Sequence, residues 1–247
     1  MSSLRRRPRR IPRVRRVSQV PDLLRAAGPA LPDRVRDGIA GLGPSVVPVL
    51  WELIENADTS GMLSNRAETE DPEQFAALAP DVRAAMHATS LLALLRPADG
   101  APRILDRMVL LGGQSPLALP LRNALTPYGL DATEAIFDAL HGTDDLDLQM
   151  LLSSVLSAAG LKDARLRSFL RNEVLPRNAD AFIDAVRYTG DPALLPDLLA
   201  LLQDAEAHPQ QIARSTWETL FGAIIACGGQ PSNDLLQRIV SLHMSAG

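Results

Sequence analysis

The stretch YTGDPALLPDLLALLQD, residues 188–204, contains a complete helix–turn–helix signal. Gly190 follows an apolar helical run and favours a left-handed C-cap, because glycine lacks the Cβ atom that makes this conformation costly. Pro192 suits the first turn of the next helix, where its missing N–H is not needed. The leucines of residues 194–202 are too many for a one-sided surface helix, so they predict a helix packed between neighbours.

The same signal recurs along the chain at a nearly constant interval. Gly100, Gly129, Gly160 and Gly190 follow one another at intervals of 29, 31 and 30 residues. A fixed period of this length is typical of repeat arrays, in which each unit buries its apolar face on its neighbours. Six glycines are each predicted to end a helix as a left-handed C-cap: Gly43, Gly100, Gly129, Gly160, Gly190 and Gly229.

The apolar spacing between these glycines predicts pairs of helices. Residues 57–80 interrupt the series as an irregular acidic insertion with one short helix near residues 72–79. Asp81 is predicted to cap the helix that follows, and Asp144, Asp145 and Asp147 mark another helix N-terminus. The predicted pairs are 21–42 (broken near 28–32) with 44–56, 81–95 with 101–111, 116–125 with 131–140, 145–159 with 163–175, 178–188 with 192–202, and 209–226 with 233–244.

Composition agrees with an all-α protein. Hydrophobic residues make up 46% of the chain but aromatic residues only 4%, and the abundance of Leu and Ala favours helix over strand. No run approaches 18 consecutive apolar residues, so we expect no membrane span. A lone cysteine, Cys227, cannot form an internal disulfide and is interpreted as a small buried hydrophobe. We expect a cytoplasmic, bacterial protein that is monomeric on its own.

Helix pairs of about 30 residues with this turn chemistry resemble HEAT repeats, particularly the short HEAT-like repeats of the phycobilisome-lyase type. The resemblance is clearest in residues 188–204 and in GLGPSVVPVLWELIEN, residues 41–56. It implies a right-handed α-solenoid, an armadillo-like helical superhelix of about six HEAT-like helix pairs over residues 20–247. It also implies that the second helix of each pair lines a concave face. The family's Asp-Val-Arg signature occurs only at residues 81–83, at a helix start.

Charged residues on the predicted second helices alternate in sign from one pair to the next. Each pair of residues lies on one helical face. One interpretation is a ladder of exposed ion pairs between adjacent helices, and the other is a mixed-charge surface that binds a partner protein. The basic pairs are Arg103 with Arg107 and Arg167 with Arg171, and the acidic pairs are Glu134 with Asp138 and Asp197 with Asp204.

The first 17 residues, MSSLRRRPRRIPRVRRV, are strongly basic and contain no acid. Proline and like-charge repulsion oppose a helix here, so residues 1–19 are predicted to be a disordered arm. The other 230 residues hold 17 basic and 29 acidic residues, a net charge of −12. The arm could be solvated, bind nucleic acid, or dock on an acidic surface. Its arginines are Arg5, Arg6, Arg7, Arg9, Arg10, Arg13, Arg15 and Arg16.

No residue pattern points to catalysis, a metal or a cofactor. The four histidines, His87, His141, His208 and His243, are scattered and form no metal-binding motif. The sequence therefore favours a non-catalytic scaffold or regulatory subunit that presents a helical surface to another protein. Two alternatives stay open: a HEAT-like lyase acting on a chromophore-bearing protein, and a nucleic-acid-associated factor that uses the arginine arm.

Overall fold

The protein is all-helical. The computed structural model describes residues 14–59, 72–207 and 214–230. The structure is 74% helical, and no strand occurs in these ranges. The all-α class predicted from composition is therefore confirmed.

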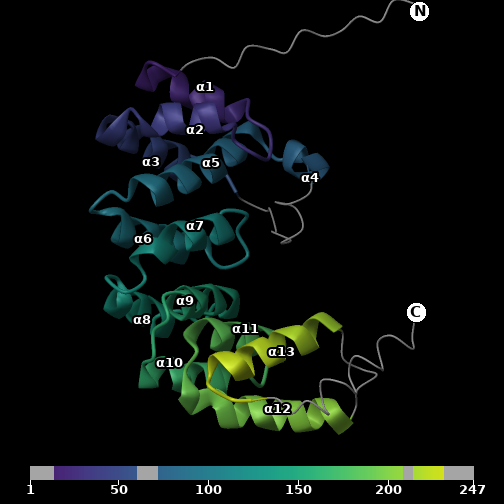
Figure 1. The fold of residues 1–247 in the computed structure, drawn as a ribbon. Coiled ribbons are helices and arrows are strands. Elements are labelled where there is room, and N and C mark those ends of the chain that lie inside the picture. The colour runs from purple at the N-terminus through teal and green to yellow at the C-terminus, as the bar shows by residue number, and fades with distance from the viewer. Residues whose placement is uncertain (1–13, 60–71, 208–213, 231–247) are drawn as a thin grey trace, which may run out of the picture. The chain divides into compact units, whose positions relative to one another are not determined.

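The chain divides into two compact units, Met1–Pro127 and Tyr128–Gly247. Figure 1 shows the described helices of both units. Those of the first unit are α1 (Val20–Arg25), α2 (Asp33–Ala40), α3 (Val47–Glu55), α4 (Pro72–Ala77), α5 (Pro80–Leu95), α6 (Gly100–Leu111) and α7 (Ala118–Leu125), with short 3-10 turns η1 (Val17–Gln19) and η2 (Gly43–Val46).

In the second unit, as in the first, the helices that were predicted as the first and second members of each pair alternate along the chain. A π-helical turn extends α10, so one predicted helix, 163–175, is observed as two consecutive segments. The described elements are α8 (Thr133–His141), α9 (Leu146–Ala158), α10 (Ala164–Phe169), η5 (Leu170–Val174), α11 (Ala179–Thr189), η6 (Pro192–Leu194), α12 (Leu195–Ala207) and α13 (Arg214–Ala226); η4 (Thr126–Tyr128) lies at the division between the units.

Helix positions follow the sequence prediction closely. Within the described residues, each predicted helix has an observed counterpart, and α4 lies in the predicted acidic insertion. Proline opens or enters the first turn of α3, α5 and η6, as its fixed φ angle favours. The predicted helix 233–244, most of the insertion and most of the N-terminal arm lie outside the described residues.

The core of the first unit is centred on α5. This helix packs on α1, α3 and α7. Its alanines Ala84, Ala85 and Ala88 are fully buried, and α3 contributes Leu50 and Ile54, also fully buried. Because alanine side chains are short, they let neighbouring backbones approach while still removing apolar surface from water.

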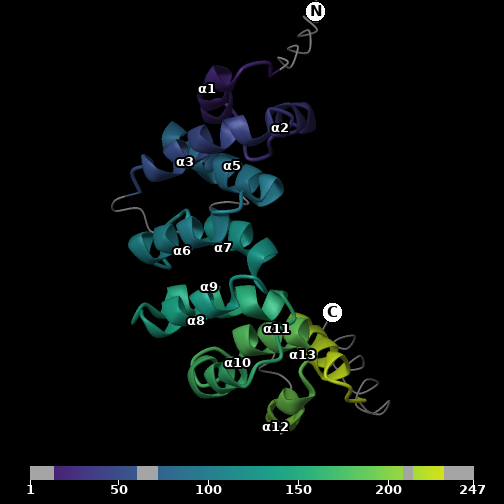
Figure 2. The same ribbon diagram turned by 90° about the vertical axis from the view of Figure 1, so that its left-hand side faces the viewer.

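In the second unit α11 lies between α9 and α13, and the contact of α11 with α13 is visible in both ribbon views (Figures 1 and 2). Two glycines make this contact close. A Cβ atom at Gly190 would lie 3.1 Å from the carbonyl oxygen of Ala226, and one at Gly222 would lie 3.3 Å from Cδ of Arg187. The backbone at Ala226 therefore leaves little room for a side chain at residue 190, and Gly222 leaves room for the stem of Arg187.

The predicted glycine C-caps are confirmed at Gly160 and Gly190, which follow α9 and α11 with φ of 72° and 54°. Gly43 is also left-handed, with φ of 63°, but it opens η2. The prediction is wrong at Gly100, Gly129 and Gly229, which are not left-handed.

The structure explains why Gly100 and Gly229 are not left-handed. Arg96, with φ of 47°, takes the left-handed C-cap of α5, and Gly100 begins α6 instead. At the other site Gly228 is left-handed. Gly229 is required for space, because a Cβ atom there would lie 2.7 Å from Cγ2 of Ile224.

The prediction that Asp81 caps a helix is also wrong. Helix α5 begins one residue earlier, at Pro80, and its N-cap position has no side-chain hydrogen bond. The Asp81 carboxylate instead accepts a hydrogen bond of 2.6 Å from Nε of Arg25 on α1. By contrast, Asp145 caps α9 as predicted, because its Oδ1 accepts from the backbone N–H of Leu148 at 3.1 Å.

We expect Gly190→Ala to destabilise the protein more than Gly160→Ala. Both positions are left-handed, which costs an alanine about 1–2 kcal/mol. A Cβ atom at Gly160 would have no neighbour within 4 Å, whereas the one at Gly190 would press on the Ala226 backbone. Urea denaturation should therefore rank the unfolding free energies as wild type, Gly160→Ala, then Gly190→Ala. Equal losses in the two variants would contradict the close approach of α11 and α13.

Candidate functional site

All six charged residues predicted on second helices lie there. Arg103 and Arg107 are on α6 in the first unit. In the second unit Glu134 and Asp138 are on α8, and Arg167 and Arg171 lie in α10 and η5. All are exposed or half-buried.

In the first unit Arg103 binds across from α6 to α3. Its guanidinium forms an ion pair with Glu55, and its Cζ lies 4.3 Å from the centroid of the Trp51 ring. Asp99, one turn earlier on its own helix, is 3.8 Å away. Trp51 is 2% exposed, so the guanidinium covers the edge of the core while it pairs with a surface carboxylate.

Arg107, one turn further along α6, caps the C-terminus of α3. Its Nη2 donates to the carbonyl oxygens of Ile54 and Glu55, each at 3.1 Å. These are the last two residues of α3, where carbonyls have no partner within the helix. A cation at this end also interacts favourably with the negative end of the helix dipole.

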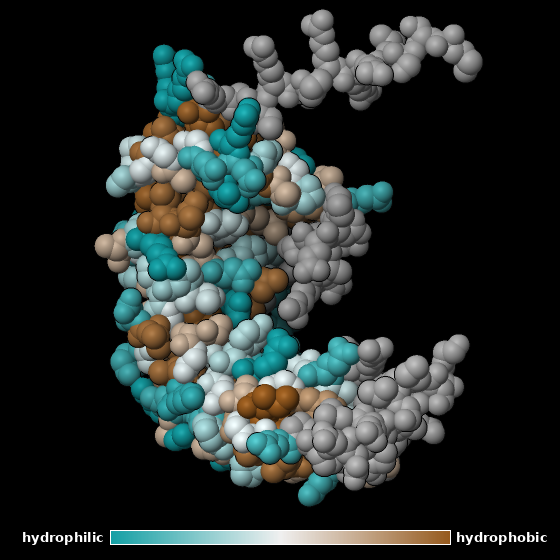
Figure 3. Space-filling model, viewed as in Figure 1, coloured by the Kyte–Doolittle hydropathy of each residue, from teal (hydrophilic) through white to brown (hydrophobic). Residues whose placement is uncertain are grey.

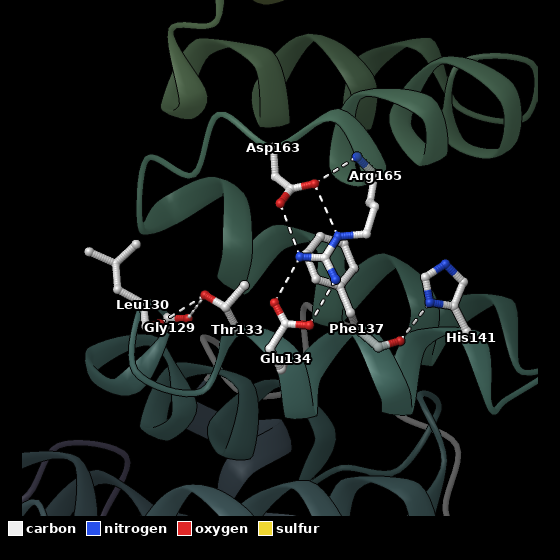
Figure 4. Close-up of polar contacts among 8 residues, drawn as sticks. All are labelled: Gly129, Leu130, Thr133, Glu134, Phe137, His141, Asp163 and Arg165. Carbon is white, nitrogen blue, oxygen red and sulfur yellow. Dashed lines mark hydrogen bonds and ion pairs between the residues drawn. The ribbon is translucent and has the colours of Figure 1, made fainter.

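The contact repeats in the second unit with different residues (Figure 4). Arg165, at the start of α10, donates to Glu134 on α8 through both Nη atoms, at 2.9 and 2.8 Å. Its Nε and Nη2 also donate to Asp163, at 3.2 and 3.0 Å. The guanidinium lies 4.0 Å from the centroid of the Phe137 ring. Sequence analysis missed Arg165, because it has no charged neighbour four residues away on the same face.

Charge pairing shifts the titration of this group of residues. The hydrogen bonds from Arg165 lower the pKa of Glu134 and of Asp163 below their ordinary values. In turn, hydrogen bonds from both carboxylates raise the pKa of Arg165. Both carboxylates therefore favour the ionised form in the folded protein.

Arg167 binds the turn that precedes η6 and α12. Its Nη1 donates to Oδ2 of Asp191 at 3.2 Å. Asp191 is 3% exposed, and its Oδ1 caps η6 by accepting from the backbone N–H of Ala193 at 3.1 Å. The buried aspartate of the Gly-Asp-Pro turn is thus both a helix cap and the partner of the half-buried Arg167, and these two contacts satisfy both of its oxygens.

Arg171, in η5, binds the first turn of α12. Its Nε and Nη2 donate to Asp197 at 3.0 and 2.6 Å, and Nη2 also reaches the carbonyl of Ala193 at 3.2 Å. The hydrogen bond with Asp197 raises the pKa of Arg171. This is one pairing that the alternating charges of the sequence indicate correctly.

We call these three sets of contacts the arginine clasps. The first is Arg103 and Arg107 on α3, the second is Arg165 on α8, and the third is Arg167 and Arg171 on η6 and α12. Each links second helices that follow one another in the chain. Of the predicted residues, Arg103, Glu134, Arg167 and Arg171 form ion pairs between helices, but only Arg171 with Asp197 joins two of the predicted charge pairs. Arg107 instead donates to backbone carbonyls.

The other predicted binding residues form no ion pair between helices in the part of the chain that the structure describes. Asp138 is exposed on α8, one turn from Glu134, and has no ion-pair partner among the described residues. Nearby, His141 donates from Nδ1 to the carbonyl of Phe137 at 2.8 Å. Of the eight arginines of the arm, Arg15 and Arg16 are described and exposed, and the other six lie outside the described residues.

Two side chains that could carry chemistry, His87 and Cys227, are buried, and for Cys227 this agrees with the sequence interpretation. His87, on α5, is 6% exposed; its Nε2 lies 2.9 Å from the carbonyl oxygen of Gly28, and its ring contacts Phe75. Burial lowers the pKa of His87, and Arg83 adds to this effect. Cys227 is 2% exposed, and burial raises the pKa of its thiol.

Within residues 14–59, 72–207 and 214–230, no three His, Cys, Asp or Glu side chains converge in a way that could hold a metal ion. No single described helix is long and apolar enough to cross a membrane; α2 with residues 43–55 meets the length and hydropathy criteria only as a pair bent by 103°.

Comparisons with known proteins add no family assignment. The chain matches no protein-family model, and searches of curated proteins and of solved structures found no significant match.

The second clasp predicts a specific pH dependence for Glu134→Gln. A carboxylate whose pKa is lowered on folding adds stability that is complete above its unfolded pKa, near 4.5, and is lost as the pH falls through the folded pKa. We expect the variant to be less stable than wild type at neutral pH, and the difference to close in acid. Urea denaturation as a function of pH measures it.

Glu52→Gln is the matched control, since Glu52 is exposed on α3 and has no ion-pair partner among the described residues. Its difference from wild type should be smaller. A Glu134→Gln difference that stays constant from neutral to acid pH would show that the pair with Arg165 does not form in solution.

Proposed function

We propose that the protein is a non-catalytic scaffold or regulatory subunit that binds another protein through its second helices. The observation that carries this proposal is the exposed face of α6. Val109 and Leu110 are 50% and 73% exposed there, beside exposed Asp106. Exposed apolar side chains among charged ones are the composition of a protein-binding surface, with an apolar centre and a polar rim.

We also propose the finer architecture that the sequence suggests: a right-handed α-solenoid of about six HEAT-like pairs, located in the bacterial cytoplasm. The support is the alternation of first and second helices and the recurrence of one kind of contact. Arg103 on Trp51 with Glu55, and Arg165 on Phe137 with Glu134, join successive second helices through the same chemistry in both units. Repetition of this kind is expected when each repeat packs on its neighbours.

A protein partner is favoured over nucleic acid by the charge of the surface. Nucleic acid requires a concentration of cations, and outside the arm the chain has 17 basic residues against 29 acidic ones. Four arginines of the clasps are already paired with carboxylates, and the fifth, Arg107, is bound to backbone carbonyls. On the face shown in Figure 3, hydrophobic residues form separate patches among hydrophilic ones.

We expect Leu110→Asp to abolish binding of the partner without unfolding the protein. Leu110 is the most exposed large apolar side chain of α6, so a charge there costs little stability but places an unpaired carboxylate in the interface. Affinity purification of the tagged full chain, followed by measurement of the stoichiometry of the recovered protein, tests the proposal.

Leu146→Asp is the control, because Leu146 is also exposed, at 47%, but begins the first helix α9. Wild type and this control should recover the same stoichiometric partner. The proposal fails if no stoichiometric partner is recovered, or if both variants retain it equally.

A further inference from the structure

The two helix layers of each unit are held together differently. In the second unit α11 packs closely on α9 and on α13, and each second helix packs on a first helix: α8 on α9, η5 on α11, and α12 on α13. Among the described helices, however, neither α8 with α10 nor α10 with α12 has closely packed backbones. In the first unit α5 packs on α1, α3 and α7, whereas α3 and α6 are not closely packed.

Long side chains connect the second helices. Arg103, Arg165 and Arg171 each extend from one second helix to the next, and their side chains are 38%, 43% and 45% exposed. Exposed ion pairs contribute about 0–1 kcal/mol each and are screened by salt. The first helices, in contrast, are joined by buried apolar residues such as Phe182 and Val186, whose packing salt does not weaken.

We propose that the arginine clasps make the second-helix layer of each unit a salt-sensitive adjustable surface, able to open while the first helices stay packed. The proposal follows from three observations. The second helices lack close backbone packing with one another, and the arginines of their main bridges, Arg103, Arg165 and Arg171, are exposed. The first helices are packed around glycine and alanine. Regions with few buried contacts open at lower free energy than the rest of a protein.

The proposal concerns the free protein and does not depend on the proposed function. An opening of this kind changes the spacing of the outer faces of α8, α10 and α12. The spacing between successive second helices would then respond to ionic strength, and to any charged group that competes for the arginines or their carboxylates.

Hydrogen exchange of the full chain tests the proposal directly. It should be compared at about 0.01 M and about 1 M NaCl, where the Debye length falls from about 30 Å to about 3 Å. We expect amides of α8, α10 and α12 to exchange about two- to fivefold faster at high salt. Amides of α9 and α11 should not accelerate. Equal acceleration in the two layers, or none in the second helices, would overturn the proposal.

Variants separate the clasps from a general effect of salt. In Arg165→Gln with Arg171→Gln, the second helices should already exchange faster at low salt and lose their further response to salt. Arg177→Gln is the matched control, because Arg177 pairs with Glu173 four residues away, at 2.8 Å, and bridges no helices. It should respond to salt as wild type does.

A double variant that keeps the full wild-type salt response would overturn the assignment to the clasps. Circular dichroism establishes that each variant keeps its helix content. If the double variant loses its fold, the comparison of wild type at the two salt concentrations still decides the proposal.

Discussion

Close packing of the first helices is the constraint on which the other features of each unit depend. In the first unit it is met by the buried alanines of α5, and in the second by Gly190 and Gly222 at the contact between α11 and α13. The second helices pack on the first helices rather than closely on one another. They reach one another through arginine, the side chain that combines a long apolar stem with a planar group able to bind two partners at once.

The positions of the helices could be predicted from sequence because they depend on local signals. Proline in first turns, a glycine after α9 and α11, and aspartate before α9 each act within a few residues. The errors arise where a contact distant in the sequence decides. Asp81 was assigned to a cap, but Arg25, which is 56 residues away, binds its carboxylate. At Gly229 the left-handed conformation falls one residue earlier, on Gly228, and the side chains of Ile224 and of the distant Leu195 leave no space for a Cβ atom.

The candidate site shows the same limit. Spacing of four residues along a helix identified Arg103, Arg107, Glu134, Arg167 and Arg171 as members of common faces, and the structure places each in a contact between helices. Spacing did not identify Arg165, because the residues four positions away, Leu161 and Phe169, carry no charge. A better signal is an aromatic residue within one turn of an acid on a second helix, as at Trp51 with Glu55 and at Phe137 with Glu134. Such a pair presents a ring and a carboxylate to one guanidinium.

The single cysteine has a practical consequence. Cys227 follows α13, is buried, and lies near enough to Asp191 for that carboxylate to help raise the pKa of the thiol. A thiol reagent in solution meets this sulfur only when the end of α13 leaves α11 and the Gly-Asp-Pro turn. The rate of thiol modification therefore measures how often the end of α13 detaches, without the need to introduce a label. An engineered surface cysteine would, for the same reason, be labelled selectively in the native protein.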